Sequence, residues 1–204
     1  MATRSEQREK TRQSILHAAL TLSTTKGLHA LSLREVTREA GVAPATFYRY
    51  FRDMDELGLT LVDQVGMKLR HMMRQARSRV RMEGSMVATS IETFMLFLDE
   101  NPELFQLLMG DLTGGPKAFR AAIFEEKQRF VDDLATDLTS DVQTVALPEH
   151  YPVIAEMMIN LVFQGGIEAL HLPKKDKKQF EQKLALQLNL ILAGSSVFAG
   201  KQEA

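Results

Sequence analysis

One stretch of the chain, LSLREVTREAGVAPATFYRYF, carries helix start and stop signals so close together that only short helices fit. Ser32 and Glu35 have the spacing of a capping box, in which each side chain satisfies a free backbone N–H at a helix start. Gly41 can supply the left-handed residue that ends a helix, and Pro44 suits the first turn of the next one. Helices are predicted over 32–40 and 44–50. Two short helices joined by a tight turn form a helix-turn-helix.

The second of these helices is too short to be stable alone, so it must dock on its neighbours. We expect its inward residues to be Val42, Phe47 and Phe51, meeting Ile15, Leu33 and Val36. The remaining residues face outward, and DNA gives a reason for their types. Small residues at the start of a recognition helix permit close approach to the major groove, while hydroxyls and arginines hold phosphates or base edges.

The predicted DNA-binding residues lie at the two helix starts and on the outward face. They are Ser32, Arg34, Pro44, Ala45, Thr46, Tyr48, Arg49 and Tyr50. Phosphate contacts are expected from Ser32, Arg34 and the two tyrosines, and base contacts from Thr46, Ala45 and Arg49. The alternative is an ordinary helical hairpin with a solvated basic face.

Charge is distributed unevenly along the chain. Residues 1–52 hold nine Lys/Arg and four Asp/Glu, whereas residues 99–168 hold four Lys/Arg and thirteen Asp/Glu, although the net charge is −1. A basic head on an acidic body suggests a polyanionic partner for the head. The absence of cysteine, of an apolar signal segment and of a long apolar run favours a soluble cytoplasmic protein with no membrane role.

Strand signals are absent, so we expect an all-α fold. Further helices are predicted over 5–26, 54–80, 84–100, 102–110, 116–139, 148–171 and 174–199. Asp53 and Glu56 repeat the cap signature before the helix at 54. Asn101-Pro102, the TGGPK segment and Pro173 provide the later breaks.

Residues 31–57, LSLREVTREAGVAPATFYRYFRDMDEL, resemble the DNA-binding signature of the TetR family of transcriptional repressors. The resemblance implies a homodimer with about nine helices per chain. It also implies a helix-turn-helix DNA-binding domain over 1–52 and a ligand-binding and dimerisation domain over 53–204. One departure is Met54, where the family commonly has a lysine that touches phosphate, so this contact is expected to be missing.

The segments FRDMDELG, LRHMMRQARSRV, NPELFQLL, AFRAAI and GGIEAL are similar to a TetR subgroup that represses unsaturated fatty-acid synthesis, the FabR and DesT regulators. This resemblance implies control of fatty-acid biosynthesis genes through long-chain acyl-CoA or acyl-carrier-protein thioesters. A regulator sensing another hydrophobic compound, such as a drug or biocide, is the alternative within the family. A helical interaction protein without a DNA role is the alternative outside it.

The body offers candidate residues for such a ligand. Adaptable methionine and phenylalanine side chains could open around an acyl chain, and two arginines on one helix face could meet the phosphates of CoA or an acidic carrier protein. The candidates are Arg70, Arg74, Phe94, Met95, Phe97, Phe105, Met109, Phe124 and Met158. The alternatives are an ordinary apolar core and a solvated basic face, which continues through Arg77 and Arg81.

The last two helices have the composition of a dimer interface. They are apolar over more than one face, and Gly165-Gly166 and Ala193-Gly194 would let backbones approach closely. A two-fold dimer also suits a palindromic operator, because one short helix reads few bases.

Nothing in the sequence points to an enzyme. The five histidines lie singly, and no phosphate-binding loop, dinucleotide fingerprint or nucleophile elbow occurs, so we expect no metal and no cofactor. The adjacent acids Glu125-Glu126 and Asp132-Asp133 diverge on a helix and are expected to be solvated rather than catalytic.

Overall fold

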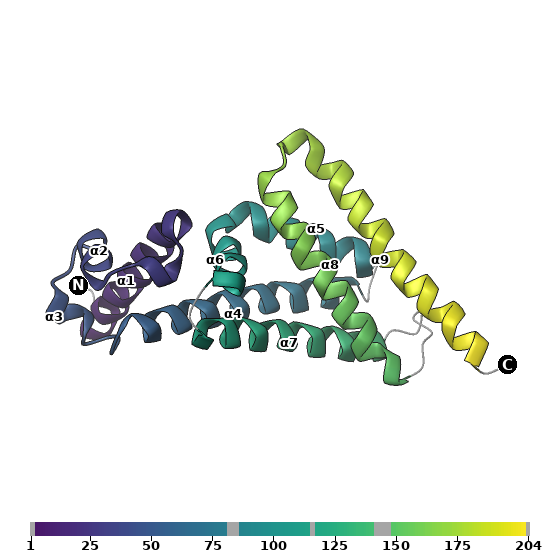
Figure 1. Ribbon diagram of the computed structural model, residues 1–204, viewed down its shortest axis with the longest axis horizontal. Helices are drawn as coiled ribbons and strands as arrows, with labels where there is room; N and C mark the ends of the chain where they lie inside the picture. The colour runs from purple at the N-terminus through teal and green to yellow at the C-terminus, as the bar shows by residue number, and fades with distance from the viewer. Residues whose placement is uncertain (1–2, 81–85, 115–116, 141–147, 203–204) are drawn as a thin grey trace. The chain divides into compact units, whose positions relative to one another are not determined.

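A computed structural model of the 204-residue chain describes residues 3–80, 86–114, 117–140 and 148–202. The regular elements of these residues are all helices, without a strand, which confirms the predicted all-α class (Figure 1). The α-helices are α1 (Arg4–Lys26), α2 (Leu33–Glu39), α3 (Pro44–Phe47), α4 (Met54–Val80), α5 (Met86–Glu100), α6 (Pro102–Gly114), α7 (Lys117–Ser140), α8 (Tyr151–His171) and α9 (Lys174–Gln202). Two 3₁₀ turns, η1 (Leu28–Ala30) and η2 (Pro148–His150), precede α2 and α8.

Most helix ends fall where the breaks in the sequence predicted them. Asn101 closes α5 by donating its backbone N–H to the carbonyl of Phe97 at 2.8 Å, and Pro102 opens α6. Pro173 separates α8 from α9. Three predictions for the body need correction: α6 continues to Gly114 instead of ending at residue 110, residues 148–150 form a 3₁₀ turn before α8, and α9 continues to Gln202 instead of ending at residue 199.

The chain groups into two compact units. Unit 1 comprises Met1–Met67 and Glu103–Phe124, and unit 2 comprises Lys68–Pro102 and Glu125–Ala204. Helices α4 and α7 therefore contribute residues to both units. The functional boundary predicted between residues 52 and 53 stays a prediction.

The core of unit 1 forms where α1, α2 and α3 meet. Ile15, Val36, Phe47 and Leu57 are fully buried, and Phe51 is 2% exposed. Helix α1 contacts both η1 and α2, and α2 contacts α3. The predicted inward set is thus confirmed for four of its members, whereas Leu33 and Val42 are only half-buried.

Gly58 marks a close approach within unit 1 between α4 and the first turns of α7. A methyl group built on Gly58 would lie 2.5 Å from Cζ of Phe119 and 2.8 Å from Cδ2 of Leu28. Phe119 and Leu28 are themselves buried. Only glycine therefore lets the Phe119 ring lie against this turn of α4.

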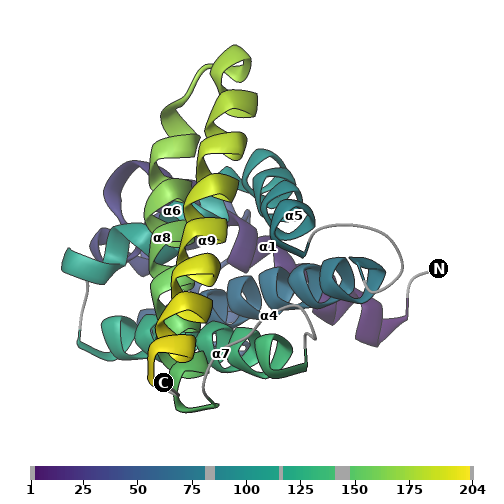
Figure 2. The same ribbon diagram turned by 90° about the vertical axis from the view of Figure 1, so that its right-hand side faces the viewer.

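Unit 2 is built on α5, α8 and α9, which contact one another pairwise. Figure 2 shows α8 and α9 as an antiparallel hairpin beside α5. At Gly165 of α8 a Cβ would meet side-chain atoms of Phe180 at 3.3 Å and of Leu184 at 3.5 Å, both on α9 of the same chain, and the predicted close approach across a dimer interface stays a prediction. Gly194 has no atom within 4 Å of a Cβ position inside the chain.

Helix α8 also has the length and composition of a membrane span, with a mean hydropathy of 1.4 over its best window. No other helix of the described part of the chain passes that test. Ile154, Met158 and Phe163 on α8 are buried, and the helix contacts α5 and α9. Val153 and Met157 on the same helix are more than half exposed, so the chain buries only part of its apolar surface.

Candidate functional site

The turn of the helix-turn-helix is a Schellman motif. Gly41 has φ of +66°, its N–H donates to the Arg38 carbonyl at 3.2 Å, and the Val42 N–H donates to the Thr37 carbonyl at 2.9 Å. These two bonds satisfy carbonyls that the end of α2 would otherwise leave without a partner. From α1, the Ser14 hydroxyl donates to the Ala40 carbonyl at 3.2 Å and ties the turn to the core.

The start of α2 is the predicted capping box. The Glu35 N–H donates to Ser32 Oγ at 3.3 Å, and the Ser32 N–H donates to Glu35 Oε2 at 3.0 Å. The Ser32 hydroxyl also donates to that carboxylate, at 2.7 Å. Lys26 Nζ donates to Glu35 Oε1 at 2.6 Å. The Lys26 bond, followed by the Ser32 bonds, lowers the pKa of Glu35 from its ordinary value of 4.5 to about 2.

Lowered pKa at Glu35 predicts an acid-sensitive head. A carboxyl group whose pKa falls on folding stabilises the native state above its unfolded pKa, and this contribution is lost as the pH falls. We expect the loss at Glu35 between about pH 4.5 and about pH 2. An NMR titration of the Glu35 carboxyl should follow this shift, and Lys26→Met should move the pKa back toward 4.5. An unchanged midpoint in Lys26→Met would contradict the assigned cause.

Helix α3 is shorter than the sequence predicted. It ends at Phe47 rather than at residue 50, and the N–H groups of Arg49 and Tyr50 donate to Thr46 and Phe47, three residues back. The Phe51 N–H returns to a four-residue bond, to the Phe47 carbonyl at 3.0 Å. The last residues therefore tighten into turns, as is common at helix ends.

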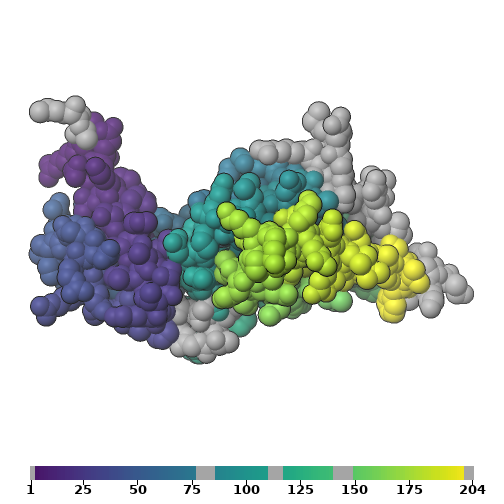
Figure 3. All heavy atoms as spheres, turned by 90° about the horizontal axis from the view of Figure 1, so that it is seen from above, coloured from purple at the N-terminus to yellow at the C-terminus, as the bar shows by residue number. Residues whose placement is uncertain are grey.

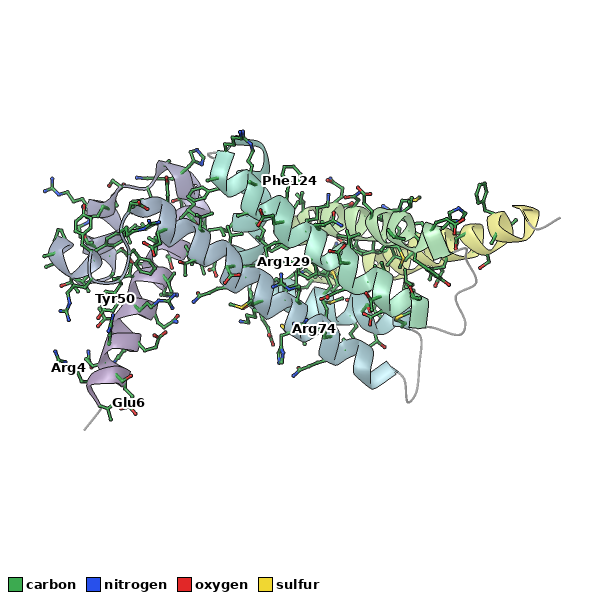
Figure 4. All side chains as sticks on the ribbon, turned by 90° about the horizontal axis from the view of Figure 1, so that it is seen from below. Arg4, Glu6, Tyr50, Arg74, Phe124 and Arg129 are labelled. Atoms are coloured by element: carbon green, nitrogen blue, oxygen red, sulfur yellow. The ribbon has the colours of Figure 1, made fainter. Side chains whose placement is uncertain are left out.

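The outward residues of α3 are accessible as predicted. Pro44, Ala45 and Arg49 are exposed, Thr46 and Tyr50 are half-buried, and Tyr48 is 62% exposed. The Tyr48 ring packs edge-on against buried Phe47, with centroids 5.7 Å apart, which leaves most of the ring in solvent. Ser32 and Arg34 are also exposed, and Figure 4 labels Tyr50 on the same part of unit 1.

The start of α4 has the cap that the sequence predicted, with one difference. The Glu56 N–H donates to Asp53 Oδ1 at 2.8 Å, but the Glu56 carboxylate accepts from Arg52, at 2.7 Å from its backbone N and 3.1 Å from Nε. The Arg52 backbone bond is the first cause that lowers the pKa of Glu56. Met54, the first residue of α4, has an uncharged side chain and cannot form the ionic phosphate contact of a lysine.

Unit 2 contains an apolar cavity with a volume of about 60 Å³. It is lined from five helices: α4 gives Met73; α5 gives Met86, Val87, Ser90 and Ile91; α7 gives Phe130, Leu134 and Leu138; α8 gives Met158, Ile159 and Val162; α9 gives Leu188 and Leu192. Among these lining residues only Ser90 is polar. The volume is well below the roughly 300–1,000 Å³ of typical ligand pockets, so a large ligand would have to widen the cavity.

A buried ion pair joins α4 and α7 close to this cavity. Arg70 pairs with Glu126, and Arg129 pairs with the second oxygen of the same carboxylate. Arg70 and Glu126 are 8% and 4% exposed, while the Arg129 side chain is 50% exposed. The Arg70 guanidinium lies over the Phe130 ring, 5.8 Å from its centroid.

Comparison with known families identifies both parts of the chain. Residues 15–59 match the family described as "Bacterial regulatory proteins, tetR family". Residues 83–194, more than half of the chain, match "Tetracyclin repressor-like, C-terminal domain". The chain belongs to the TetR family. It is therefore a transcriptional regulator with a DNA-binding helix-turn-helix.

Solved TetR-type structures share the fold. A transcriptional regulator of the TerR/AcrR family from Aquifex aeolicus VF5 has a TM-score of 0.71 and 19% identity, covering 89% of this chain and 99% of that one. A TetR-family regulator from Syntrophomonas wolfei has a TM-score of 0.72 and 16% identity, covering 91% and 96%. The fatty acid degradation regulator FadR from Bacillus halodurans has a TM-score of 0.66 and 18% identity, covering 90% and 95%. The TetR-like fold is thus confirmed.

In this TetR regulator, one of the predicted ligand residues, Met158, lines the cavity. Phe94, Met95 and Phe97 are buried in unit 2 but are not among the lining residues. The other apolar candidates belong to unit 1, where Phe105 is buried, Met109 is half-buried and Phe124 is 56% exposed. Arg70 is buried and paired, and Arg74 is exposed, 3.7 Å from Asp133. The predicted continuation at Arg77 and Arg81 lies outside the described side chains.

The sequence interpretation missed the role of Glu126. We expected the pair Glu125-Glu126 to be solvated, but Glu126 is buried and ion-paired, while Glu125 is exposed. A signal existed, because Glu126 lies between Ile123 and Phe130 on one helix face, and both of these are buried. Helical spacing alone therefore placed the carboxylate on the inward face of α7.

Proposed function

We propose that this TetR regulator is a repressor whose two heads contact successive turns of a palindromic operator. The exposed outward face of α3 supports this proposal. Thr46, Ala45 and Arg49 would meet base edges, while Tyr48, Tyr50, Arg34 and Ser32 would hold phosphates. The Ser32 hydroxyl already donates to Glu35. We therefore expect the backbone at this helix start to contribute more to phosphate binding than the hydroxyl does.

Phosphate and base contacts predict different responses to substitution. Tyr48→Phe and Arg34→Ala should weaken binding by similar factors on every operator sequence, because a phosphate contact carries no base information. Thr46→Ala should change which base is preferred, by about 1–3 kcal/mol of discrimination. Gel shifts with DNA from the promoter region of the protein's own gene, and with operator variants that differ by one base pair, measure both effects. If all three variants bind like the parent protein, the recognition assignment fails.

We propose further that α8 and α9 form the interface of a homodimer. Apolar side chains remain exposed there in the single chain: Val153, Met157, Leu186, Leu190, Val197 and Phe198, each between 51% and 62%. Figure 3 shows part of α9 on the surface of unit 2. Covering such residues is favourable by about 25 cal/mol for each Å² of apolar area, which supports a second copy on this face.

A charge placed on this face should dissociate the dimer. Leu190→Glu would bury an uncompensated carboxylate in the interface, which is strongly unfavourable. Light scattering should then report the 23.0 kDa chain in place of a dimer. Leu96→Glu, at a leucine of α5 that is 52% exposed, is the matched control and should leave the dimer intact. Dissociation by both variants, or by neither, would argue against this face.

The effector that we propose is a long-chain acyl thioester of CoA or acyl carrier protein, which would make the regulated genes those of fatty-acid biosynthesis. The apolar cavity supports an acyl chain as occupant, because its walls carry three adaptable methionines, Met73, Met86 and Met158. Arg74 is 58% exposed and 3.7 Å from Asp133, and it would exchange this surface pair for phosphates of the CoA moiety. Widening the cavity would move α4, because this helix carries Met73. The same helix begins directly after its cap residue Asp53, where the DNA-binding head ends.

Such a regulator needs two states that differ in affinity for the effector and for DNA. Mass spectrometry of ligand retained by the purified protein, followed by operator binding with saturated and unsaturated acyl-CoAs, tests the assignment. A change in operator affinity in either direction supports it. Val162→Phe should fill the cavity and remove the response while leaving operator binding by the free protein intact.

A different hydrophobic effector, such as a drug or biocide, is the second candidate. The uncharged lining of the cavity favours any apolar compound of suitable size as much as an acyl chain. A response to such compounds, with none to acyl-CoAs, would exclude the fatty-acid assignment and leave the repressor assignment standing.

A further inference from the structure

The ion pair between α4 and α7 joins one carboxylate to two arginines. Glu126 is shared by two arginines, Arg70 on the buried side and Arg129 on the exposed side. Figure 4 labels Arg129 on α7 and Arg74 on α4, in the part of unit 2 where these helices run side by side. Arg74 has its own acidic neighbour, Asp133 at 3.7 Å. The Glu126 carboxylate therefore bridges two arginines, one buried on α4 and one half-exposed on α7.

This cluster adjoins the apolar cavity through one shared ring. Phe130 lines the cavity and also lies under the Arg70 guanidinium. The helix positions agree, since Glu126 precedes Phe130 by four residues and Arg70 precedes Met73, another lining residue, by three. Residues three or four apart lie on one helix face. An amphiphile whose chain occupies the cavity would thus bring its polar end toward Arg70.

Arg70 has the chemistry to accept an incoming anion. A guanidinium binds carboxylates and phosphates through a planar fork of N–H donors. Burying the existing ion pair already carries a large desolvation cost. Replacing one oxyanion of the pair with another should therefore change the free energy less than forming a new buried pair would. When the Glu126 carboxylate leaves Arg70, it can stay paired with Arg129, which is half-exposed.

We propose that Arg70 binds an oxyanion carried by the effector, and that this oxyanion replaces Glu126. The inference rests on the proposed function, since it assumes that the chain of the effector enters the cavity. It adds the chemical class of the polar end, which is a carboxylate or a phosphate. Because a carboxylate of a fatty acid and a phosphate of an acyl-CoA share this chemistry, both are tested.

Four ligands with the same hydrocarbon chain separate the head groups: hexadecanoate, palmitoyl-CoA, hexadecanol and hexadecylamine, each titrated below its micelle concentration into the full-length protein by calorimetry. At least one of the two anionic ligands should bind about tenfold or more tightly than hexadecanol, as expected for a charge-assisted hydrogen bond. The ligand that shows the preference identifies the oxyanion as carboxylate or phosphate.

Two substitutions then have opposite expected signs. Arg70→Gln should remove the preference for the anionic ligand, whereas Glu126→Gln should raise affinity for it severalfold, because the internal competitor loses its charge. A purely structural pair would weaken binding in both variants. Lys178→Gln is the control, since it removes a cation from the exposed Lys178–Glu181 pair on α9 and should change nothing.

The outcomes separate this inference from the proposed function. Equal binding of all four ligands by the unmodified protein would overturn the oxyanion site and leave the acyl-binding cavity standing. Tighter binding of hexadecylamine than of the anions would also overturn it. If no ligand binds and Val162→Phe behaves like the parent, the proposed effector fails first. The comparison of head groups needs no variant, so it holds even where Arg70→Gln folds poorly.

Discussion

Replacing Glu126 with alanine is expected to lower the free energy of unfolding by about 3–5 kcal/mol, the usual cost of leaving a buried charge without its partner. Arg70 would lose this carboxylate while remaining 8% exposed over the Phe130 ring. Surface pairs have far smaller effects, and the Lys178–Glu181 pair on α9 should contribute at most about 1 kcal/mol. Denaturant unfolding at one fixed protein concentration measures both, because dimer stability depends on concentration.

A double variant tests the cause. Glu126→Leu combined with Arg70→Met replaces both charges with apolar groups of similar volume, and such replacements are often neutral or stabilising. The double variant should therefore be more stable than Glu126→Ala, although it should lose any preference among effector head groups. If the double variant is as unstable as the single one, packing rather than charge accounts for the loss.

The head could be predicted from sequence because its determinants are local. A capping box, a left-handed glycine and a first-turn proline each act within four residues, and the structure has all three at Ser32, Gly41 and Pro44. The exposed and buried faces of α3 followed from the same spacing. The error in the predicted end of α3, at residue 50 instead of Phe47, also has a local cause. Backbone N–H groups there can donate three or four residues back, and the sequence gives no clear signal for which bond forms.

The body was predicted less well because its site depends on packing between distant segments. Apolar residues such as Phe94 and Leu134 look alike in the sequence, yet only Leu134 lines the cavity. Five helices must be placed before that difference exists. The spacing on α7 could have placed Glu126 on the inward face, but its pairing with Arg70 could not be predicted, since the two residues are 56 positions apart and lie on different helices. Charge runs read along one helix cannot reveal a partner on another.

Gly58→Ala is expected to destabilise unit 1, against the usual preference of helices for alanine. Alanine in a helix interior is favoured over glycine by about 1 kcal/mol. Here the added methyl would lie 2.5 Å from Cζ and 2.7 Å from Cε1 of Phe119, closer than carbon atoms approach, and 2.8 Å from Leu28. Both neighbours are buried, so relief requires the first turns of α7 to move, and overpacking of this kind costs about 1–3 kcal/mol. The clash should exceed the propensity gain.

The compensating change is on α7. Phe119→Leu removes the ring atoms that the methyl would meet, so Gly58→Ala should cost less in the Phe119→Leu background than in the parent, a coupling that a double-mutant cycle measures. Because Phe119 and Gly58 join α7 to α4 beside Leu28 of η1, in the same unit as the helix-turn-helix, the single variant should also weaken operator binding. If the effects of the two substitutions were additive, the Phe119 ring would have to avoid the added methyl group by moving elsewhere. Gly58 and Phe119 would then not be energetically coupled.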